Sequence, residues 1–580
     1  MPTPSLLQRL KERKLVQWAL AYLCGAWVLV EAASLVVDQF SWPPIVSQVV
    51  TILAFFGFFV VLVIAWYHGE KGRQWVSGPE LLIIALLLLI SGGVLSILGT
   101  GEEEPEQFEP SGSVAMGDDR PSVAILPCDN LSADPADAFL APALHDEILL
   151  KLQGISSVFS TGRATVAWYA ENPAPLSQTA QELGVGFVGE CSVQRSGDRI
   201  RLIFQLLDGR TGGQVWADDY QRELTAGNLF DIQSDIAQQV ASAMRAVLTP
   251  EEVARLASAP TENTEAYEEY LRGRFHWSTR SPQALELAAE HFRRAIAVDS
   301  AFAHAYSGLA DSYAVLPFYS PEGSPDEMFR LGEEAAQQAV RLAPDLAEAH
   351  ASLGYLRLVS RRDWEGAERE LRQAIELDPS YPSAHHWLSD LLAFSEKSEE
   401  SIIQEQAALE LDPLSFISNF TLGHRYYWSR RYDQAIRQYE KVVELHPFNY
   451  LGWAGLSEVL FLSDSVDYAV RSRSRADELF GTDPGVSETF NRMASEFHRN
   501  GIPGTFPPAF DTISNWSVLI KANSAMLVGD TLKALAFLEQ AALDNRPDLL
   551  IVRVSPLWDP LRHNPRFQGI LAQYAGDVGH

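Results

Sequence analysis

A spacing of 34 residues, repeated in strict register, constrains the fold of this chain more than any other feature. Prolines mark the period at Pro379, Pro413 and Pro447. Small residues recur where two helices must touch, at Ala367, Ser401, Ala435 and Ala469. Leucines recur in the first half of each period, at Leu388, Leu422 and Leu456. A period of this length predicts a linear array of similar structural units, because each unit buries its apolar face only against its neighbours.

Each period holds two amphipathic helical stretches closed by a proline, which resembles the tetratricopeptide repeat. The resemblance implies stacked helix pairs that curve into a superhelix with a concave surface. We assign the repeats to residues 262–481, with a lengthened second unit and one extra residue near 361–364 of the third. For residues 482–580 we expect a loop, one degenerate repeat and a cap at the C-terminal end.

The concave surface of such repeats comes largely from fixed positions of the first helix in each pair. In this chain those positions predict a partner-binding groove lined by Tyr355, His386, Asp390, Phe394, Phe420, His424, Tyr427, Trp428, Glu458 and Phe461. Aromatic, histidine and carboxylate side chains along one stripe suit an extended or helical peptide. The alternative is that some of these aromatic rings pack between repeats or against the lengthened loop.

Apolar residues crowd the first hundred positions. Residues 15–37, 45–67 and 81–98 have about the length that a helix needs to cross a bilayer. Lysines and arginines precede the first run and lie between the second and third, which predicts a cytoplasmic N-terminus. We therefore expect three transmembrane helices over residues 1–99 and an acidic flexible linker over 100–120. This topology predicts a bacterial inner (cytoplasmic) membrane protein with most of the chain on the periplasmic side.

Residues 121–250 predict a small α/β domain. Strands are expected at 122–127, 158–160, 187–194, 199–207 and 214–220, and Ser196-Gly197-Asp198 is a hairpin turn signal between two of them. Helices are expected up to about Leu152, over 176–183 and after Asn228, which can cap the closing helix. The predicted fold class is thus multi-domain: a three-helix transmembrane bundle, a small α/β domain and an all-α tetratricopeptide-repeat superhelix.

Several segments of this domain resemble the TolB amino-terminal-like domain, which is related to the FlgO type. They are SVAILPCDNLSADP, HDEIL, ELGVGFVGECSVQRSGDRIRLIFQLLDGRTGGQVWADDY and FDIQSDIAQQV. The resemblance implies a bacterial protein in which this domain precedes tetratricopeptide repeats. It brings no catalytic residue that maps onto this chain.

Residues 184–189 match the glycine pattern of dinucleotide-binding sites, G-x-G-x-x-G. Such a site needs the pattern after a strand and at the start of a helix. Here the pattern follows a predicted helix and enters a predicted strand. We therefore interpret it as a helix end followed by a strand, and we expect no cofactor.

Charge and cysteine content exclude further classes. The chain has 45 basic and 75 acidic residues, a net charge of −30, and its basic residues form no patch of the kind that nucleic-acid binding requires. Cys24, Cys128 and Cys191 are too few for a disulfide scaffold or a four-cysteine zinc site. We favour two separate buried thiols for Cys128 and Cys191, and a disulfide is the alternative if their strands are neighbours. His304, Asp311, His385 and His386 lack a regular ligand interval, so we expect no metal.

These observations favour a membrane-anchored extracytoplasmic scaffold that binds a protein or peptide through the groove. The alternative is a transmembrane signalling or regulatory subunit that couples an external binding event to a separate cytoplasmic effector. An enzyme ranks third, because the chain lacks P-loop, H-E-x-x-H, G-x-S-x-G and C-x-x-C motifs. Oligomerisation through the spans or the repeats stays open.

Overall fold

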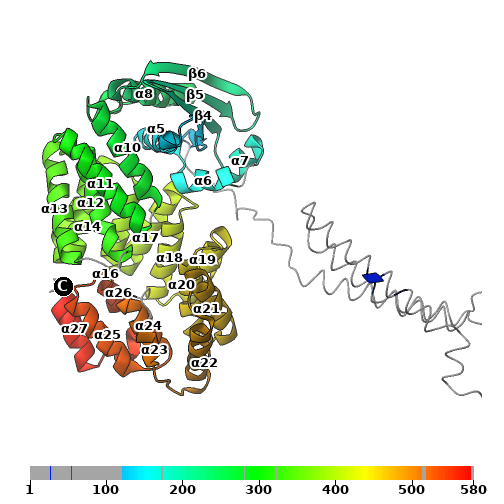
Figure 1. Cartoon of the computed structure of the whole chain (residues 1–580), viewed down its shortest axis with the longest axis vertical. Helices are drawn as coiled ribbons and strands as arrows, with labels where there is room; N and C mark the ends of the chain where they lie inside the picture. The colour runs from blue at the N-terminus through cyan, green and yellow to red at the C-terminus, as the bar shows by residue number, and fades with distance from the viewer. Residues whose placement is uncertain are drawn as a thin grey trace, which may run out of the picture. The chain divides into compact units, whose positions relative to one another are not determined.

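The computed structural model describes residues 120–171, 174–279, 281–319, 324–511 and 517–575, together with Tyr22, Ala26, Trp27 and Ala54. The chain divides into two compact units, Met1–Gly112 and Ser113–His580. Nearly all described residues belong to the second unit, which begins with the α/β domain and continues into helix pairs (Figure 1).

The fold class predicted from the sequence is wrong in one part. Among the described residues, no helix is both long enough and apolar enough to cross a bilayer. The predicted spans over 15–37, 45–67 and 81–98, and residues 100–119 of the predicted linker, lie outside the described residues apart from the four named above. The prediction rested on hydropathy and loop charge, and an apolar run by itself does not make a spanning helix. The fold class is corrected to a small α/β domain followed by a helical superhelix of tetratricopeptide type.

A mixed sheet forms the core of the α/β domain, with strand order β3-β1-β4-β5-β6 and β2 beside β4 (Figure 1). The strands are β1 (Ser122–Ile125), β2 (Asp129–Asn130), β3 (Phe159–Ser160), β4 (Phe187–Ser196), β5 (Arg199–Asp208) and β6 (Gln214–Glu223). The accompanying helices are α5 (Leu140–Gln153), α6 (Arg163–Glu171), α7 (Leu176–Leu183), α8 (Ala226–Ala243) and α9 (Pro250–Ala257). The five predicted strands are confirmed, whereas α6 and α9 were not predicted.

Local signals explain the ends of these elements. Gly184 ends α7 at φ 65°, and Gly197 turns the β4–β5 hairpin at φ 63°, a region that only glycine enters without strain. The glycine pattern at 184–189 is therefore a helix end and a strand start, as predicted. The cap of α8 differs from the prediction, because Thr225 is the N-cap and its hydroxyl accepts from the backbone N–H of Asn228.

Cys128 and Cys191 form a disulfide, so the preferred interpretation as two separate thiols is wrong. Their Cα atoms lie 4.6 Å apart. The reason is strand pairing that the sequence did not reveal: β4 carries Cys191 and pairs in parallel with both β1 and β2, which flank Cys128. The bond joins two cysteines that are 63 positions apart in the sequence.

Six helix pairs follow in the repeat region (Figure 1). Their first helices are α10 (Thr264–Thr279), α12 (Ala303–Tyr319), α14 (Ala347–Leu356), α16 (Pro382–Phe394), α18 (Phe416–Trp428) and α20 (Tyr450–Phe461). Their second helices are α11 (Pro282–Val298), α13 (Pro325–Leu342), α15 (Trp364–Leu377), α17 (Ser398–Leu411), α19 (Tyr432–Leu445) and α21 (Val466–Phe480). The predicted extra residue of the third pair coincides with a π-helical turn, η2 (Arg357–Arg361), the usual form of a one-residue insertion in a helix.

Large rings on second helices pack against glycines on first helices. The ring of Tyr439 lies between Gly423 and Gly455, and a Cβ atom added at either glycine would stand 2.8 or 2.6 Å from it. Phe292 lies in the same way between Gly273 and Gly308. Contacts this short leave no room for any side chain, so glycine at these positions lets neighbouring helices approach closely.

The residues after the sixth pair do not simply cap the end of the array. They form α22 (Pro484–Asn500), α23 (Pro508–Asp511), α24 (Val518–Leu527), α25 (Thr531–Leu543), α26 (Leu549–Val554), η3 (Pro556–Leu561) and α27 (Pro565–Ala575). We call α24 to α27 the C-terminal module. It folds back beside the first helices of the middle repeats, with α26 packed on α16 (Figure 1).

The residues at one position of the 34-residue period contact the C-terminal module in three consecutive repeats. Arg362, Glu396 and Arg430 each occupy the turn between the two helices of a repeat, and all three adopt the left-handed conformation. Arg362 donates to Asn545 at 2.9 Å, and Arg430 donates to Asp559 at 2.7 Å. Glu396 accepts from Arg553 at 3.2 Å. Consecutive repeats thus offer consecutive polar contacts to one folded segment.

Candidate functional site: the groove of the repeats

The ten predicted groove residues all lie on first helices, from α14 to α20. Five of them are buried, namely Tyr355, Phe394, Tyr427, Trp428 and Phe461. The other five are half-buried, namely His386, Asp390, Phe420, His424 and Glu458. None of the ten is fully exposed, and their side chains make different kinds of contact.

Several of the buried rings pack between repeats, which is the alternative stated for them. Tyr355 stacks on Trp387 of the next first helix, with ring centroids 5.0 Å apart. Phe394 contacts Trp428 across the following interface at 5.8 Å. Phe461 lies 5.0 Å from His498 of α22. Such rings hold neighbouring repeats together, and little of their surface is left for a partner.

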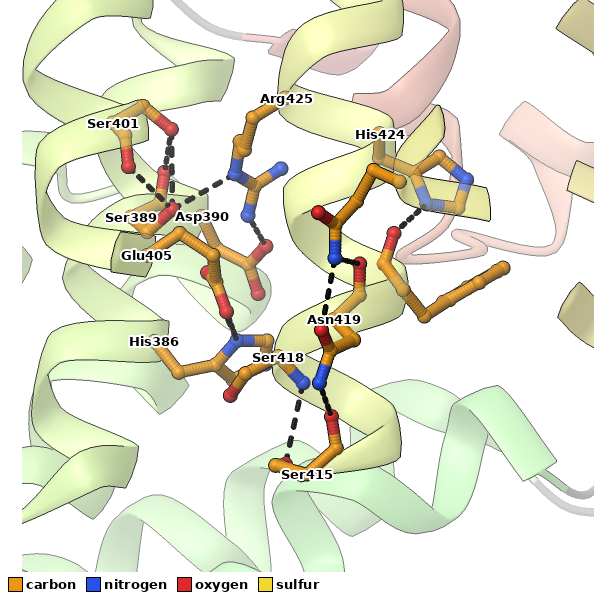
Figure 2. Close-up of polar contacts among 12 residues, drawn as sticks. His386, Ser389, Asp390, Ser401, Glu405, Ser415, Ser418, Asn419, His424 and Arg425 are labelled. Carbon is orange, nitrogen blue, oxygen red and sulfur yellow. Dashed lines mark hydrogen bonds and ion pairs between the residues drawn. The ribbon is translucent and has the colours of Figure 1, made fainter. Parts of the chain in front are cut away.

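His386 and Asp390 belong to an internal polar network (Figure 2). His386 Nδ1 lies 3.2 Å from the carboxylate of Glu405, which has no exposed surface. Burial disfavours charge on the imidazole, but the adjacent charges of Glu405 and Asp390 outweigh it and raise the pKa of His386. Asp390 accepts from the buried guanidinium of Arg425, whose Nε donates to Ser389 at 2.8 Å.

The remaining predicted residues meet at one cavity, which we call the groove cavity. Its volume is about 190 Å³, and Phe420, His424, Tyr427 and Glu458 line it. Other lining residues are Tyr450 at the start of α20, Tyr439 and Phe480 on second helices, and Asn523 of the C-terminal module. The sequence does not reveal the lining residues of the module, because no periodic signal indicates that α24 returns to this face.

Burial controls the ionisation of the polar groups in the groove cavity. It lowers the pKa of His424 to about 4, with the nearby Arg425 acting in the same direction. The neutral ring places Nδ1 3.2 Å from the backbone oxygen of Phe420, so Nδ1–H donates there and Nε2 is the acceptor nitrogen. Burial also raises the pKa of Glu458, although the neighbouring Tyr427 hydroxyl and the charge of Arg473 oppose the rise.

The groove cavity combines aromatic walls with the carboxyl groups of Glu458 and Asp477 and the guanidinium of Arg473, which donates to Asp477 at 2.9 Å. A cavity of 150 Å³ in another protein accepts a benzene molecule, so about 190 Å³ has room for the end of a side chain. Rings of this kind attract cations through their faces, and a carboxylate strengthens that preference. The described residues include no cluster of three or more histidine, cysteine, aspartate or glutamate side chains that would hold a metal ion.

Comparison with known proteins supports the repeat assignment. Residues 356–416 and 420–478 match the family model for the tetratricopeptide repeat, so the predicted repeats are confirmed there. The chain is similar to a curated protein of Rhizobium meliloti (strain 1021) named "Putative adenylate cyclase 3", with 30% identity over 291 residues. That similarity covers 49% of this chain and 42% of the relative, so this chain spans less than half of the relative's length.

The chain is also similar to solved structures of repeat proteins. The structure of YrrB, a TPR protein with an unusual peptide-binding site, is 23% identical with a TM-score of 0.22, covering 34% of this chain and 96% of YrrB. A thermophilic TPR protein of Thermus thermophilus is 17% identical with a TM-score of 0.28, covering 36% of this chain and 98% of that protein. At these scores the likeness carries no argument about a ligand. The repeats themselves are those of a protein-interaction scaffold.

Proposed function

We propose that this chain is a non-catalytic scaffold that binds a basic peptide segment of a partner protein, with one cationic side chain entering the groove cavity. The observation that carries the proposal is the cavity itself, where four residues predicted for the groove surround one space. A net charge of −30 favours a basic partner, because it raises the local concentration of cations.

The ionisation of Glu458 gives the cavity its preference for a cation. Burial raises the pKa of this carboxyl because the ionised form is poorly solvated there. The only nearby cation in the lining, Arg473, is already paired with Asp477, so a lysine or arginine head that enters the cavity adds a counter-charge for Glu458. Phe420 and Tyr439 line the same cavity, and aromatic rings attract cations.

The α/β domain serves as a fixed spacer in this proposal. Tyr270 of α10 donates to Glu147 of α5 at 3.2 Å, and both side chains are buried. Thr165 of α6 donates to Asp412 at 2.6 Å, at the end of the fourth repeat. These two anchor points are far apart in sequence and hold the domain against the array. Its resemblance to the TolB amino-terminal-like domain fits a spacer or a second docking surface.

The proposal also places the folded domains in an oxidising compartment outside the cytoplasm, such as the bacterial periplasm. The Cys128–Cys191 disulfide supports this location, because structural disulfides persist where thiols are not kept reduced. Alkylation of the chain with and without reductant, in whole cells, measures the fraction that is oxidised. A fully reduced pair in cells would contradict the location.

Cyclase activity is not part of the proposal. The name of the Rhizobium relative belongs to that protein, and the similarity covers less than half of it. Incubation of the purified chain with ATP and a divalent cation, followed by chromatography of the products, checks this. Reproducible formation of cyclic nucleotide would refute a purely non-catalytic scaffold.

A peptide array tests the proposed partner class. Immobilised peptides with one lysine or arginine are compared with matched peptides that carry glutamate at that place. We expect wild type to retain basic peptides, and Glu458→Gln to bind them about tenfold more weakly, which corresponds to about 1.4 kcal/mol. Glu410→Gln, at an exposed position of α17, is the matched control. Equal binding by both variants, or a preference for the acidic set, would refute the role of the groove cavity.

A further inference from the structure

A second cavity lies where the fifth repeat meets the C-terminal module, and its chemistry is opposite to that of the groove cavity. Its volume is about 340 Å³. Four guanidinium groups line it, from Arg425, Arg430, Arg553 and Arg562. We call it the arginine pocket. Two of these residues belong to the end of the fifth repeat's first helix and its turn, and two belong to the module.

The carboxylates near the arginine pocket are already engaged. Glu396, the acidic residue of the lining, accepts from Arg553 at 3.2 Å. Asp559 is shared between Arg430 at 2.7 Å and Arg562 at 3.2 Å. Asp390 receives the guanidinium of Arg425. Arg430 and Arg562 each also donate to a backbone oxygen, of Trp428 and Ser555 respectively. Each guanidinium carries five N–H donors, so these partners still leave some of them available.

Two buried donors at the pocket have no hydrogen-bond partner in the described part of the chain, Arg425 Nη1 and Trp428 Nε1. Arg425 is only 2% exposed. Its Nε and Nη2 donate to Ser389 and Asp390, whereas its third nitrogen points away from both (Figure 2). Its guanidinium lies 5.0 Å from the ring centroid of Trp428, so the two unpaired donors belong to neighbouring side chains. A buried N–H without an acceptor is costly, and an anion supplies acceptors.

We propose that the arginine pocket binds a phosphate group. Its four arginines come from α18, the turn after α18, α26 and the residue that follows η3, so they surround the space from separate parts of the chain. A tetrahedral oxyanion presents acceptors in several directions, whereas a planar carboxylate engages one guanidinium fork. The volume exceeds what inorganic phosphate fills, and the pocket therefore accommodates a phosphate monoester as well as the free ion.

A bound phosphate would join the C-terminal module to the repeats. Arg553 and Arg562 approach it from the module, and Arg425 and Arg430 approach it from the fifth repeat. A ligand that binds only the docked arrangement stabilises that arrangement by mass action. Phosphate therefore controls how firmly the module covers the first helices, including the wall that α24 contributes to the groove cavity.

Titration calorimetry on the full chain tests the site, with sodium phosphate, O-phosphoserine and sodium acetate at equal ionic strength. We expect one site, with the phosphate compounds at least tenfold tighter than acetate. Tighter binding of O-phosphoserine identifies an ester as the ligand, and tighter binding of phosphate identifies the free ion. Absence of saturable phosphate binding, or equal affinity for acetate, would overturn the proposal.

Arginine variants in the module distinguish phosphate binding at the pocket from a general effect of positive charge. Arg553→Gln and Arg562→Gln should each weaken phosphate binding at least tenfold. Arg566→Gln removes an exposed arginine of α27 that pairs with Glu539 outside the pocket, and it should bind as wild type does. Equal losses in all three variants would sink the assignment to this pocket.

Hydrogen exchange gives a second readout that does not depend on variant folding. In wild type, saturating phosphate should slow amide exchange in α26 and η3, which carry or flank the module's two arginines. The exchange of β4 and β5 in the α/β domain serves as the internal control. Unchanged exchange in α26 and η3 would refute the bridge between module and repeats.

Discussion

The groove cavity and the arginine pocket share helix α18 but have opposite chemistry. Phe420, His424 and Tyr427 line the first cavity, whereas Arg425 and Trp428 line the second. Residues 420, 424 and 427 follow the three-to-four spacing of one helix face, and residues 425 and 428 follow the same spacing on the adjacent face. One helix therefore separates a space suited to cations from a space suited to anions.

The C-terminal module closes both cavities, and that arrangement explains how they differ from an open repeat groove. Asn523 of α24 reaches the groove cavity, and Arg553 of α26 reaches the arginine pocket. A concave face that exists in repeats alone would be a continuous surface. Here the module supplies part of the walls of two separate cavities, so each has its own lining and its own electrostatic preference.

The largest effect is expected at Arg425, the residue between the two cavities. Arg425→Ala leaves Asp390 without its buried counter-charge and should destabilise the fold by about 3–5 kcal/mol in urea unfolding. The removed charge also lies near His424, so the pKa of His424 should rise in the variant. Arg372→Ala, an exposed arginine of α15, is the control and should change stability by less than about 1 kcal/mol. A small loss at Arg425 would mean that the pair contributes little.

The pH dependence of stability distinguishes the two histidines of this region. The pKa of His424 is about 4 in the fold, below its ordinary value of 6.5, so the unfolded chain takes up this proton first as the pH falls. The stability linked to His424 is fully present above pH 6.5 and is lost as the pH falls towards 4, by up to about 3 kcal/mol. His424→Gln should flatten the profile of unfolding free energy between pH 7 and 4.

His386 should act in the opposite sense. Its pKa is raised in the fold, so the stability that it contributes is present below pH 6.5 and is lost as the pH rises through the folded-state value. His386→Gln should therefore lower stability more at pH 6 than at pH 8. If His424→Gln and His386→Gln changed the pH dependence of the unfolding free energy in the same direction, the assigned environments of the two histidines would be contradicted.

Sequence reasoning located these cavities only in part. The 34-residue period placed Phe420, His424, Tyr427 and Glu458 on first helices, and those four residues do line one space. The period could also have suggested a contact between Asp390 and Arg425, which occupy almost equivalent positions of successive repeats. It could not reveal where α24 to α27 dock, because their packing depends on surfaces far away in the chain.

The same division holds for the α/β domain. Alternating apolar residues and the Ser196-Gly197-Asp198 turn predicted the β4–β5 hairpin, since both signals are local. The Cys128–Cys191 bond depends on parallel pairing between β4 and strands more than fifty residues earlier. At the N-terminal end, apolar runs predicted a three-helix bundle; no helix of the described residues is long and apolar enough to span a membrane, and the predicted spans lie outside those residues apart from four positions.

A methyl group added at Gly455 tests whether free space in the groove cavity is needed for peptide binding. Gly455→Ala places a Cβ atom 2.6 Å from the ring of Tyr439, so the ring must shift. We expect a loss of about 1–3 kcal/mol from overpacking and weaker retention of basic peptides on the array. Gly569→Ala in α27 meets no atom within 4 Å and should be neutral or stabilising by up to about 1 kcal/mol. Unchanged peptide binding in Gly455→Ala would show that the partner does not enter the groove cavity.

The smallest effect is expected at Trp428, and it concerns the arginine pocket alone. Trp428→Phe keeps a ring but removes the buried indole N–H that has no partner in the described structure. Without phosphate, lost packing and removal of the unpaired donor oppose one another, so stability should stay within about 1 kcal/mol of wild type. With saturating phosphate, the variant should gain about 0.5–1.5 kcal/mol less than wild type, the contribution of one hydrogen bond. Trp387→Phe, whose ring stacks on Tyr355 away from the pocket, should lose the same stability with and without phosphate. If Trp428→Phe behaves like Trp387→Phe, the indole does not face the anion, and the arginine pocket must be defined by its guanidinium groups alone.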